Sequence, residues 1–91
     1  MRIDKFLKLS RIIKRRAVAK DLADQGRIEI NDKRAKSAAN VGTNDLITIH
    51  FGNKTLVVRV LKLAEIVKKD EAQDLYEVVS ESYEQQDDKE D

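Results

Sequence analysis

Five cations near the start of the chain are the residues whose type and spacing most clearly point to a chemistry. They are Arg11, Lys14, Arg15, Arg16 and Lys20, and the first acidic residue after them is Asp21. On a helix, Arg11 and Arg15 would stand four residues apart, as would Arg16 and Lys20. Like charges at this spacing repel one another. A polyanionic partner relieves that repulsion, so the cluster favours nucleic-acid binding over a solvated helix face.

The distribution of charge supports the same reading. Residues 1–36 contain 12 basic and 5 acidic residues, whereas residues 70–91 contain 1 basic and 10 acidic residues. The net charge of +1 therefore conceals a basic start and an acidic end. A basic surface steers toward a polyanion. The acidic end is interpreted as a solubilising terminus, with competition against nucleic acid as the alternative, and residues 84–91 are expected to be a disordered tail.

Catalytic, metal and cofactor chemistry find little support in the sequence. The 91 residues include no cysteine and one histidine, and neither GxxxxGK[ST] nor GxGxxG occurs. His50 is predicted to lie at the surface or at a sheet edge, and Asp4 to cap a helix. We therefore expect a protein that is not an enzyme and has no cofactor and no metal site. The first 16 residues contain no apolar run longer than two, which predicts a cytosolic protein without a membrane span.

The periodicity predicts an α+β fold: two N-terminal helices packed on a small, mostly antiparallel sheet, with a short C-terminal element. The helices are expected at residues 4–9 and 11–25, with a break or second cap at Ser10 and a stop at Gly26. One hairpin is expected around Asn31-Asp32, and a second across Gly52-Asn53 with strands 46–51 and 54–61. Residues 70–75 favour a helix, and residues 76–80 either extend it or add a strand.

The aromatic residues bear on the kind of nucleic acid. Phe6 and Phe51 are expected in the core, and Tyr76 and Tyr83 lie in the acidic end, so no aromatic residue accompanies the basic cluster. Stacking on single-stranded bases is poorly supported. Structured RNA, contacted through its phosphates and shape, fits better. The apolar pattern is complete enough to predict a folded monomer in isolation.

Three stretches of the sequence resemble one known family. They are Met1-Arg2-Ile3-Asp4-Lys5-Phe6-Leu7-Lys8, Lys14-Arg15-Arg16-Ala17-Val18-Ala19-Lys20 and Gly26-Arg27-Ile28-Glu29-Ile30-Asn31. Their pattern, RLDKFL followed by SRxxAxxLIxxGxVxVNG, is similar to that of the alpha-L RNA-binding domain, named for ribosomal small-subunit protein four. Arg15 replaces a serine that caps the second helix in many members, which predicts an earlier helix start. Asp32 replaces the usual turn glycine.

The resemblance implies a division of the chain and a set of RNA contacts. Residues 1–62 would form the alpha-L domain, 63–83 a C-terminal extension packed on it, and 84–91 the acidic tail. By position in the family pattern, the first candidates for phosphate contacts are Arg2, Lys5, Arg16 and Lys20, followed by Arg11, Lys14, Arg15 and Lys36.

Residues 71–77 and the short length are most similar to the small, stand-alone ribosome-binding members of the heat-shock-fifteen-like family. This resemblance implies binding to the rRNA of a large ribosomal subunit and to the stalled peptidyl-tRNA it carries. It also implies cooperation with the factor RqcH, which adds alanine to the stalled chain. Two alternatives remain open: a general RNA chaperone or ribosome-assembly factor, and a protein adaptor that docks a basic partner through residues 70–91.

Overall fold

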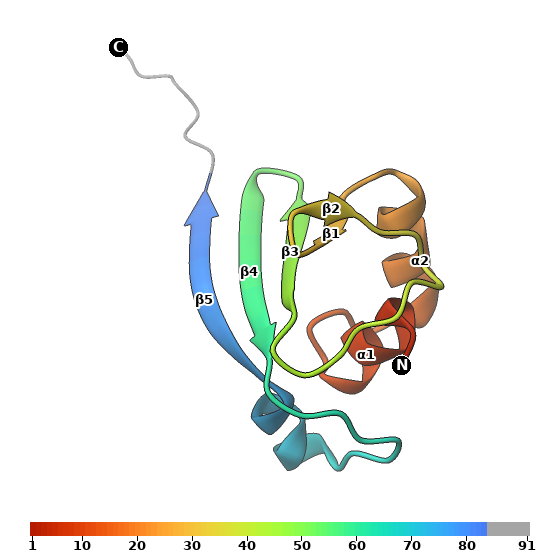
Figure 1. Cartoon of the computed structure of the whole chain (residues 1–91), viewed down its shortest axis with the longest axis vertical. Helices are drawn as coiled ribbons and strands as arrows, with labels where there is room; N and C mark the ends of the chain where they lie inside the picture. Colours follow the sequence, from red (N-terminus) through yellow and green to blue (C-terminus); the bar gives the residue numbers. More distant parts are fainter. Residues whose placement is uncertain (84–91) are drawn as a thin grey trace.

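The computed structural model describes residues 1–83, in which two helices cover one face of a five-stranded antiparallel sheet (Figure 1). The helices come first, and the strand order across the sheet is β2-β1-β3-β4-β5. The elements are α1 (Ile3–Leu9), α2 (Arg16–Asp24), β1 (Ile28–Ile30), β2 (Lys33–Arg34), β3 (Leu46–Phe51), β4 (Lys54–Val60), the 3-10 helix η1 (Lys69–Leu75) and β5 (Tyr76–Tyr83). The predicted α+β class is confirmed. The tail predicted at 84–91 lies outside the described residues.

The core lies between the helices and the sheet. Ile47 and Ile49 of β3 are fully buried, and buried Val58 and Val60 of β4 alternate with the partly buried Val57 and Arg59. These buried residues belong to one apolar cluster with Ile3, Phe6 and Leu7 of α1 and with Ala19 and Ala23 of α2. Both helices are therefore fixed to the sheet by close packing, which positions the polar residues that their outer faces carry.

The two predicted hairpins are present. Asn31 and Asp32 have φ angles of +53° and +69°, the pair of left-handed conformations that a type I′ hairpin turn requires. Gly52 has a φ of +47° at the first position of the turn between β3 and β4. Asn31 further ties the first turn to the start of β3, because its Oδ1 accepts a hydrogen bond from the N–H of Leu46 at 3.0 Å.

The predicted helix start at Arg11 is wrong, because α2 begins only at Arg16. Arg11 adopts a φ of +62°, which ends the helical path, and Ser10 closes α1 as predicted. The physical reason is tertiary: Ile13 is 5% exposed, and its N–H donates to the carbonyl of Leu7 at 3.1 Å. Burying Ile13 folds residues 11–15 back against the end of α1.

The predicted capping role of Asp4 is also wrong. Arg2 occupies the N-cap position of α1 and makes no side-chain cap, and Asp4 is the second helical residue. The chain after β2 takes over the role of a cap, since the N–H of Ile3 donates to the carbonyl of Ala39 at 2.7 Å and that of Asp4 to Ser37 at 3.4 Å. The carboxylate of Asp4 is therefore available for another function.

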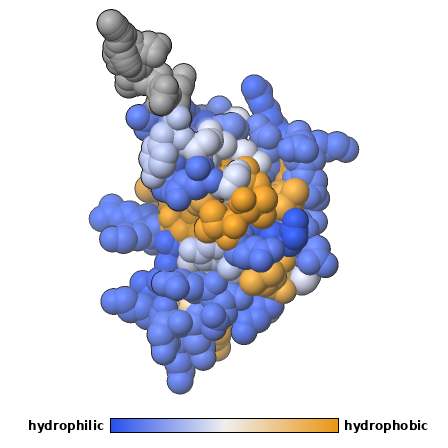
Figure 2. All heavy atoms as spheres, turned by 90° about the vertical axis from the view of Figure 1, so that its left-hand side faces the viewer, coloured by the Kyte–Doolittle hydropathy of each residue, from blue (hydrophilic) through white to orange (hydrophobic). Residues whose placement is uncertain are grey.

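Residues 76–83 form a strand, which resolves the alternative left open by the sequence. The strand β5 pairs with β4 from Val60–Tyr76 to Lys54–Tyr83, with one irregularity beside Val57 and Val58. Val78 and Val79 on this strand are about half exposed. Figure 2, which views the molecule from the β5 side, shows apolar surface at the centre of that face, bordered by hydrophilic residues.

The helices of residues 1–83 are all too short and too polar to cross a membrane.

Candidate nucleic-acid interface

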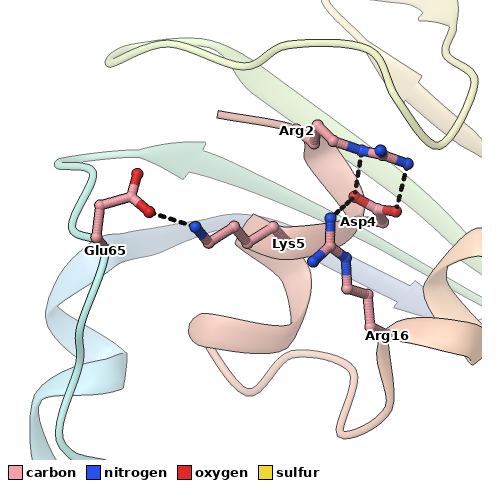
Figure 3. Close-up of polar contacts among 5 residues, drawn as sticks. All are labelled: Arg2, Asp4, Lys5, Arg16 and Glu65. Carbon is pink, nitrogen blue, oxygen red and sulfur yellow. Dashed lines mark hydrogen bonds and ion pairs between the residues drawn. The ribbon is translucent and has the colours of Figure 1, made fainter.

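A carboxylate between two arginines is the central feature of the basic surface (Figure 3). Arg2 binds Asp4 through two parallel hydrogen bonds, from Nε to Oδ1 at 3.2 Å and from Nη2 to Oδ2 at 3.1 Å. Nη2 of Arg16, at the first residue of α2, donates to Oδ1 of the same carboxylate at 3.3 Å. Asp4 thus connects the start of α1 to the start of α2 through their arginines.

The burial of the three side chains differs sharply. The Asp4 side chain is 4% exposed, whereas those of Arg2 and Arg16 are 48% and 44% exposed. Burial raises the pKa of Asp4, but the hydrogen bonds and positive charges of Arg16 and Arg2 together lower it by more than burial raises it. The pKa of Asp4 therefore lies below its usual value of 3.8. The carboxylate is therefore ionised at neutral pH and acts as a buried anchor for two half-exposed cations.

The geometry leaves donors available for an external anion. A guanidinium carries five N–H donors in a plane, of which Arg2 uses two on Asp4 and Arg16 uses one. In addition, the N-terminus of α2 has no side-chain cap and no acidic residue in its first turn. Unpaired N–H groups at a helix start favour an anion. A phosphate beside Arg16 would meet both kinds of donor.

Lys5 is engaged elsewhere. Its ammonium group forms an ion pair with Glu65, in the segment between β4 and η1, and Figure 3 shows it pointing away from the arginine pair. The hydrogen bond from Lys5 lowers the pKa of Glu65. Among the candidate residues, Lys5 is therefore brought to a different side of α1 from Arg2 and Arg16.

Lys20 stands one helical turn after Arg16 on α2, as the sequence predicted, and is exposed. Arg15 is the N-cap residue of α2 and is exposed as well. Neither side chain forms an ion pair with any residue from 1 to 83. The proposed helical repulsion between Arg11 and Arg15 is not present, because these two residues lie in the connection before α2. Only the Arg16–Lys20 pair has that spacing on a helix.

Arg11 and Lys14 share a small hollow with Lys8 of α1, bordered by Leu9 and Val67. Lys8 was not among the residues ranked as candidates for phosphate contacts, although it is exposed and adds a third cation to this hollow. The turn at Arg11 brings the three residues together. A sequence pattern that places residues 11–15 on a helix cannot anticipate this arrangement.

Lys36 lies at a second place on the surface. It borders a groove between the end of α2 and β2, together with Arg34, another cation that the candidate set omitted. The next residue, Ser37, accepts the hydrogen bond from the backbone of Asp4. The chain from Arg34 to Ser37 therefore connects this groove to the arginine pair.

His50 is half-exposed on the central strand β3, so the surface position predicted for it is confirmed and the edge position is wrong. Its Nε2 lies 3.1 Å from Oε2 of Glu29, and its Nδ1 lies 3.3 Å from Oγ1 of Thr55. Both partners belong to neighbouring strands, which makes this histidine a cross-strand contact of the sheet.

Comparison with known proteins identifies the class to which the fold and the basic surface belong. Residues 1–47 match the S4 domain, an RNA-binding domain, and this chain is therefore an S4-domain protein. The match includes both arginines, Asp4, α2 and the first hairpin. The resemblance to the alpha-L RNA-binding domain is confirmed.

The chain belongs to the family of RQC P-site tRNA stabilizing factors. It is 52% identical to the protein of that name from Streptococcus pneumoniae over 90% of this chain and 93% of the relative. It is 49% identical to the Bacillus subtilis protein over 89% and 94% of the two chains. Together with a 34% identical heat shock protein 15 from Escherichia coli, these relatives confirm the predicted membership of the heat-shock-fifteen-like family.

A solved structure extends the similarity to the fold. Heat shock protein 15 of Vibrio cholerae, whose structure is described as trimeric, superposes with a TM-score of 0.80 at 28% identity, over 88% of this chain and 82% of that chain. Both helices and the sheet therefore have counterparts in a heat-shock-fifteen protein.

Proposed function

We propose that this protein binds the rRNA of the large ribosomal subunit and the stalled peptidyl-tRNA, and thereby supports RqcH-dependent alanine tailing of the stalled chain. The names of the relatives, which refer to a P-site tRNA, support this function. The observation that carries it is the pair of half-exposed arginines held on buried Asp4. The proposed role is binding without catalysis.

The arginine pair explains how so small a protein could hold a tRNA in place. Phosphate contacts fix the register and orientation of a nucleic acid on a protein surface. An unsupported arginine loses side-chain entropy when it binds, whereas Arg2 and Arg16 are already ordered by Asp4. The two side chains come from different helices, and both helices are packed on the same core. Their separation is therefore fixed by the fold.

The other cations would extend the contact surface. We propose that Lys20 and Arg15 continue it along α2, that Arg11 and Lys14 contact RNA from the connection before α2, and that Lys36 does so from the segment after β2. Lys5 would join after exchanging Glu65 for a phosphate, because its present ion pair is exposed and weak. This division places the RNA contacts in residues 1–62 and leaves residues 63–83 as a packed extension.

A complementation experiment tests this function. In a bacterium lacking its own copy, a stalling reporter is expressed with wild-type protein, with Arg2→Ala or with Arg16→Ala, and the C-terminal alanine tails are measured by mass spectrometry. We expect tails with the wild type and their loss with either variant. Arg59→Ala is the matched control, because Arg59 alternates with buried Val58 and Val60 and so points away from the helices. Normal tails with both arginine variants would refute the proposed role of the pair.

The same proposal includes a monomer that works in the cytosol. Light scattering of the isolated protein checks the oligomeric state, and a mass of one chain is expected. The general RNA chaperone is the competing function. It would replace the proposal if RNA crosslinked to the wild-type protein in cells were spread over many unrelated RNAs, because a P-site factor crosslinks mainly to tRNA and large-subunit rRNA.

A further inference from the structure

A groove between the C-terminal end of α2 and the strand β2 has features of a nucleotide-binding site. Its volume is about 540 Å³, within the range of roughly 300–1,000 Å³ common for small-molecule sites. The residues that line it are Ala23, Asp24, Gln25, Gly26, Arg34, Ala35 and Lys36. It therefore combines two small apolar side chains, two cations, one carboxylate and one amide. In Figure 1 the chain leaves α2 and turns into the β1–β2 hairpin, so the end of the helix and the hairpin that supply these residues are close in sequence.

Gly26 and Arg34 are in close contact at the groove. Gly26 has a φ of +76°, and a Cβ atom at this position would stand 3.4 Å from both Nε and Cζ of Arg34. The guanidinium group thus lies against the bare backbone of the glycine. Arg34 forms no ion pair with any of the residues that the structure describes. A planar cation that rests on the backbone and has no acidic partner is suited to stack on another planar group.

The charges around the groove favour a neutral base at the α2 end and a phosphate on the opposite side. The C-terminal end of α2 carries a partial negative charge, and Asp24 adds a full one, so an anion at this end of the groove is disfavoured. A neutral base can donate its N–H groups to the carboxylate of Asp24 and exchange hydrogen bonds with the amide of Gln25. Lys36 and Arg34, on the hairpin side, provide positive charge for the phosphate of the same nucleotide.

We propose that the groove binds one unpaired nucleotide of the RNA, with its base stacked on the Arg34 guanidinium and its phosphate beside Lys36. The proposal rests on the proposed RNA-binding function and adds a feature to it: a preference for RNA that offers an extruded base. Bases that are paired in an A-form helix are stacked within it, and proteins therefore read sequence mainly at loops, bulges and ends. A bulged or looped nucleotide near a duplex would reach the groove while the duplex phosphates contact Arg2 and Arg16.

Two RNA hairpins test the proposal, one fully paired and one identical except for a single bulged nucleotide. Binding of each fluorescently labelled hairpin to the full chain is measured by anisotropy. One stacked base contributes measurably to affinity, so we expect the wild type to prefer the bulged hairpin by about tenfold, which corresponds to about 1.4 kcal/mol. Equal affinity of the wild type for the two hairpins would overturn the proposal while leaving the proposed function intact. Failure to bind either hairpin would contradict the phosphate-binding surface around Arg2 and Arg16 on which the proposal rests.

Variants assign the preference to Arg34. Arg34→Lys keeps the charge and removes the planar group, and it is expected to lower the preference to about one while the affinity for the paired hairpin is kept. Lys33→Ala is the control, because Lys33 is the exposed neighbour on β2 and does not line the groove. Lys33→Ala should lower the affinity for both hairpins by the same factor. Thermal unfolding followed by circular dichroism checks that each variant is folded. A preference retained in Arg34→Lys would contradict the stacking role.

Discussion

Replacing Asp4 by asparagine separates two effects on RNA binding: the positioning of the arginine pair and the net charge of the protein. The substitution preserves the size of the side chain and removes its negative charge. It also places an amide N–H₂ group against a guanidinium, because Asp4 uses both oxygens to accept hydrogen bonds from Arg2 and Oδ1 to accept one from Arg16. At least one of the three bonds becomes a contact between two donors, and each remaining bond joins a guanidinium to a neutral carbonyl oxygen, so it is no longer part of an ion pair.

The expected cost follows from the burial of the three side chains. Hydrogen bonds to a charged group are worth about 1.5–3 kcal/mol each when buried. Here the carboxylate is buried, but about half of each arginine side chain is exposed, so water replaces part of what is lost. We therefore expect Asp4→Asn to lower the free energy of unfolding by about 1–2 kcal/mol. For a domain of this size that corresponds to a fall in Tm of about 5–15 °C.

RNA binding and unfolding are measured on the same samples. Asp4→Asn makes the protein more positive by one charge, so an account based on charge alone predicts tighter binding to RNA. The positioning account predicts weaker binding to large ribosomal subunits, because the two arginines are no longer ordered. Glu65→Gln is the control, since it makes the same charge change at the exposed partner of Lys5 and should leave the Tm unchanged. Asp4→Asn protein that is folded and binds subunits as tightly as wild type would refute the reasoning.

Three further predictions concern stability and salt. Asp32→Gly should raise the free energy of unfolding by about 0.5–1 kcal/mol in urea denaturation, because Asp32 has a φ of +69° that glycine adopts without strain; an unchanged or lower value would contradict this. The pKa of Asp4 is lower in the folded protein than its usual 3.8, so its contribution to stability is complete above that pH and is lost as the pH falls through the folded-state pKa. The difference in free energy of unfolding between wild type and Asp4→Asn should therefore shrink as unfolding curves are measured at successively lower pH below 3.8. A difference that stays constant over this pH range would contradict the prediction. Arg16→Ala should reduce the slope of log K against log salt for RNA binding by about 0.7–0.9, the value for one phosphate contact, whereas an identical slope would mean that Arg16 touches no phosphate.

The sequence predicts the sheet well because its signals are local. Alternation of apolar residues predicts strands at 46–51 and 54–61, which the structure forms as Leu46–Phe51 and Lys54–Val60. Asn31-Asp32 and Gly52-Asn53 supply the turn residues between neighbouring strands. Such patterns depend on a few adjacent residues, and no distant contact overrides them here. The choice between helix and strand for residues 76–80 was different, because pairing with β4 decides it.

The site was less predictable because long-range contacts build it. The start of α2 depends on the burial of Ile13, and the role of Asp4 depends on Arg16, twelve residues away. Charge patterning located the basic region but could not distinguish Arg16 from its neighbours. The family resemblance selected Arg2 and Arg16 by position, and the structure adds the carboxylate that they share. The groove at Arg34 forms only when the hairpin packs beside the end of α2.

Sedimentation of the tagged protein with ribosomes tests the central claim most directly. Lysates containing wild type, Arg16→Ala or the control Arg59→Ala are separated on a gradient, and RNA crosslinked to the protein in each fraction is sequenced. The proposed function predicts that wild type and Arg59→Ala migrate with the large subunit and crosslink to tRNA, while Arg16→Ala, which remains folded, stays at the top. Wild-type protein absent from the large-subunit fractions, or Arg16→Ala migrating with them as wild type does, would contradict it.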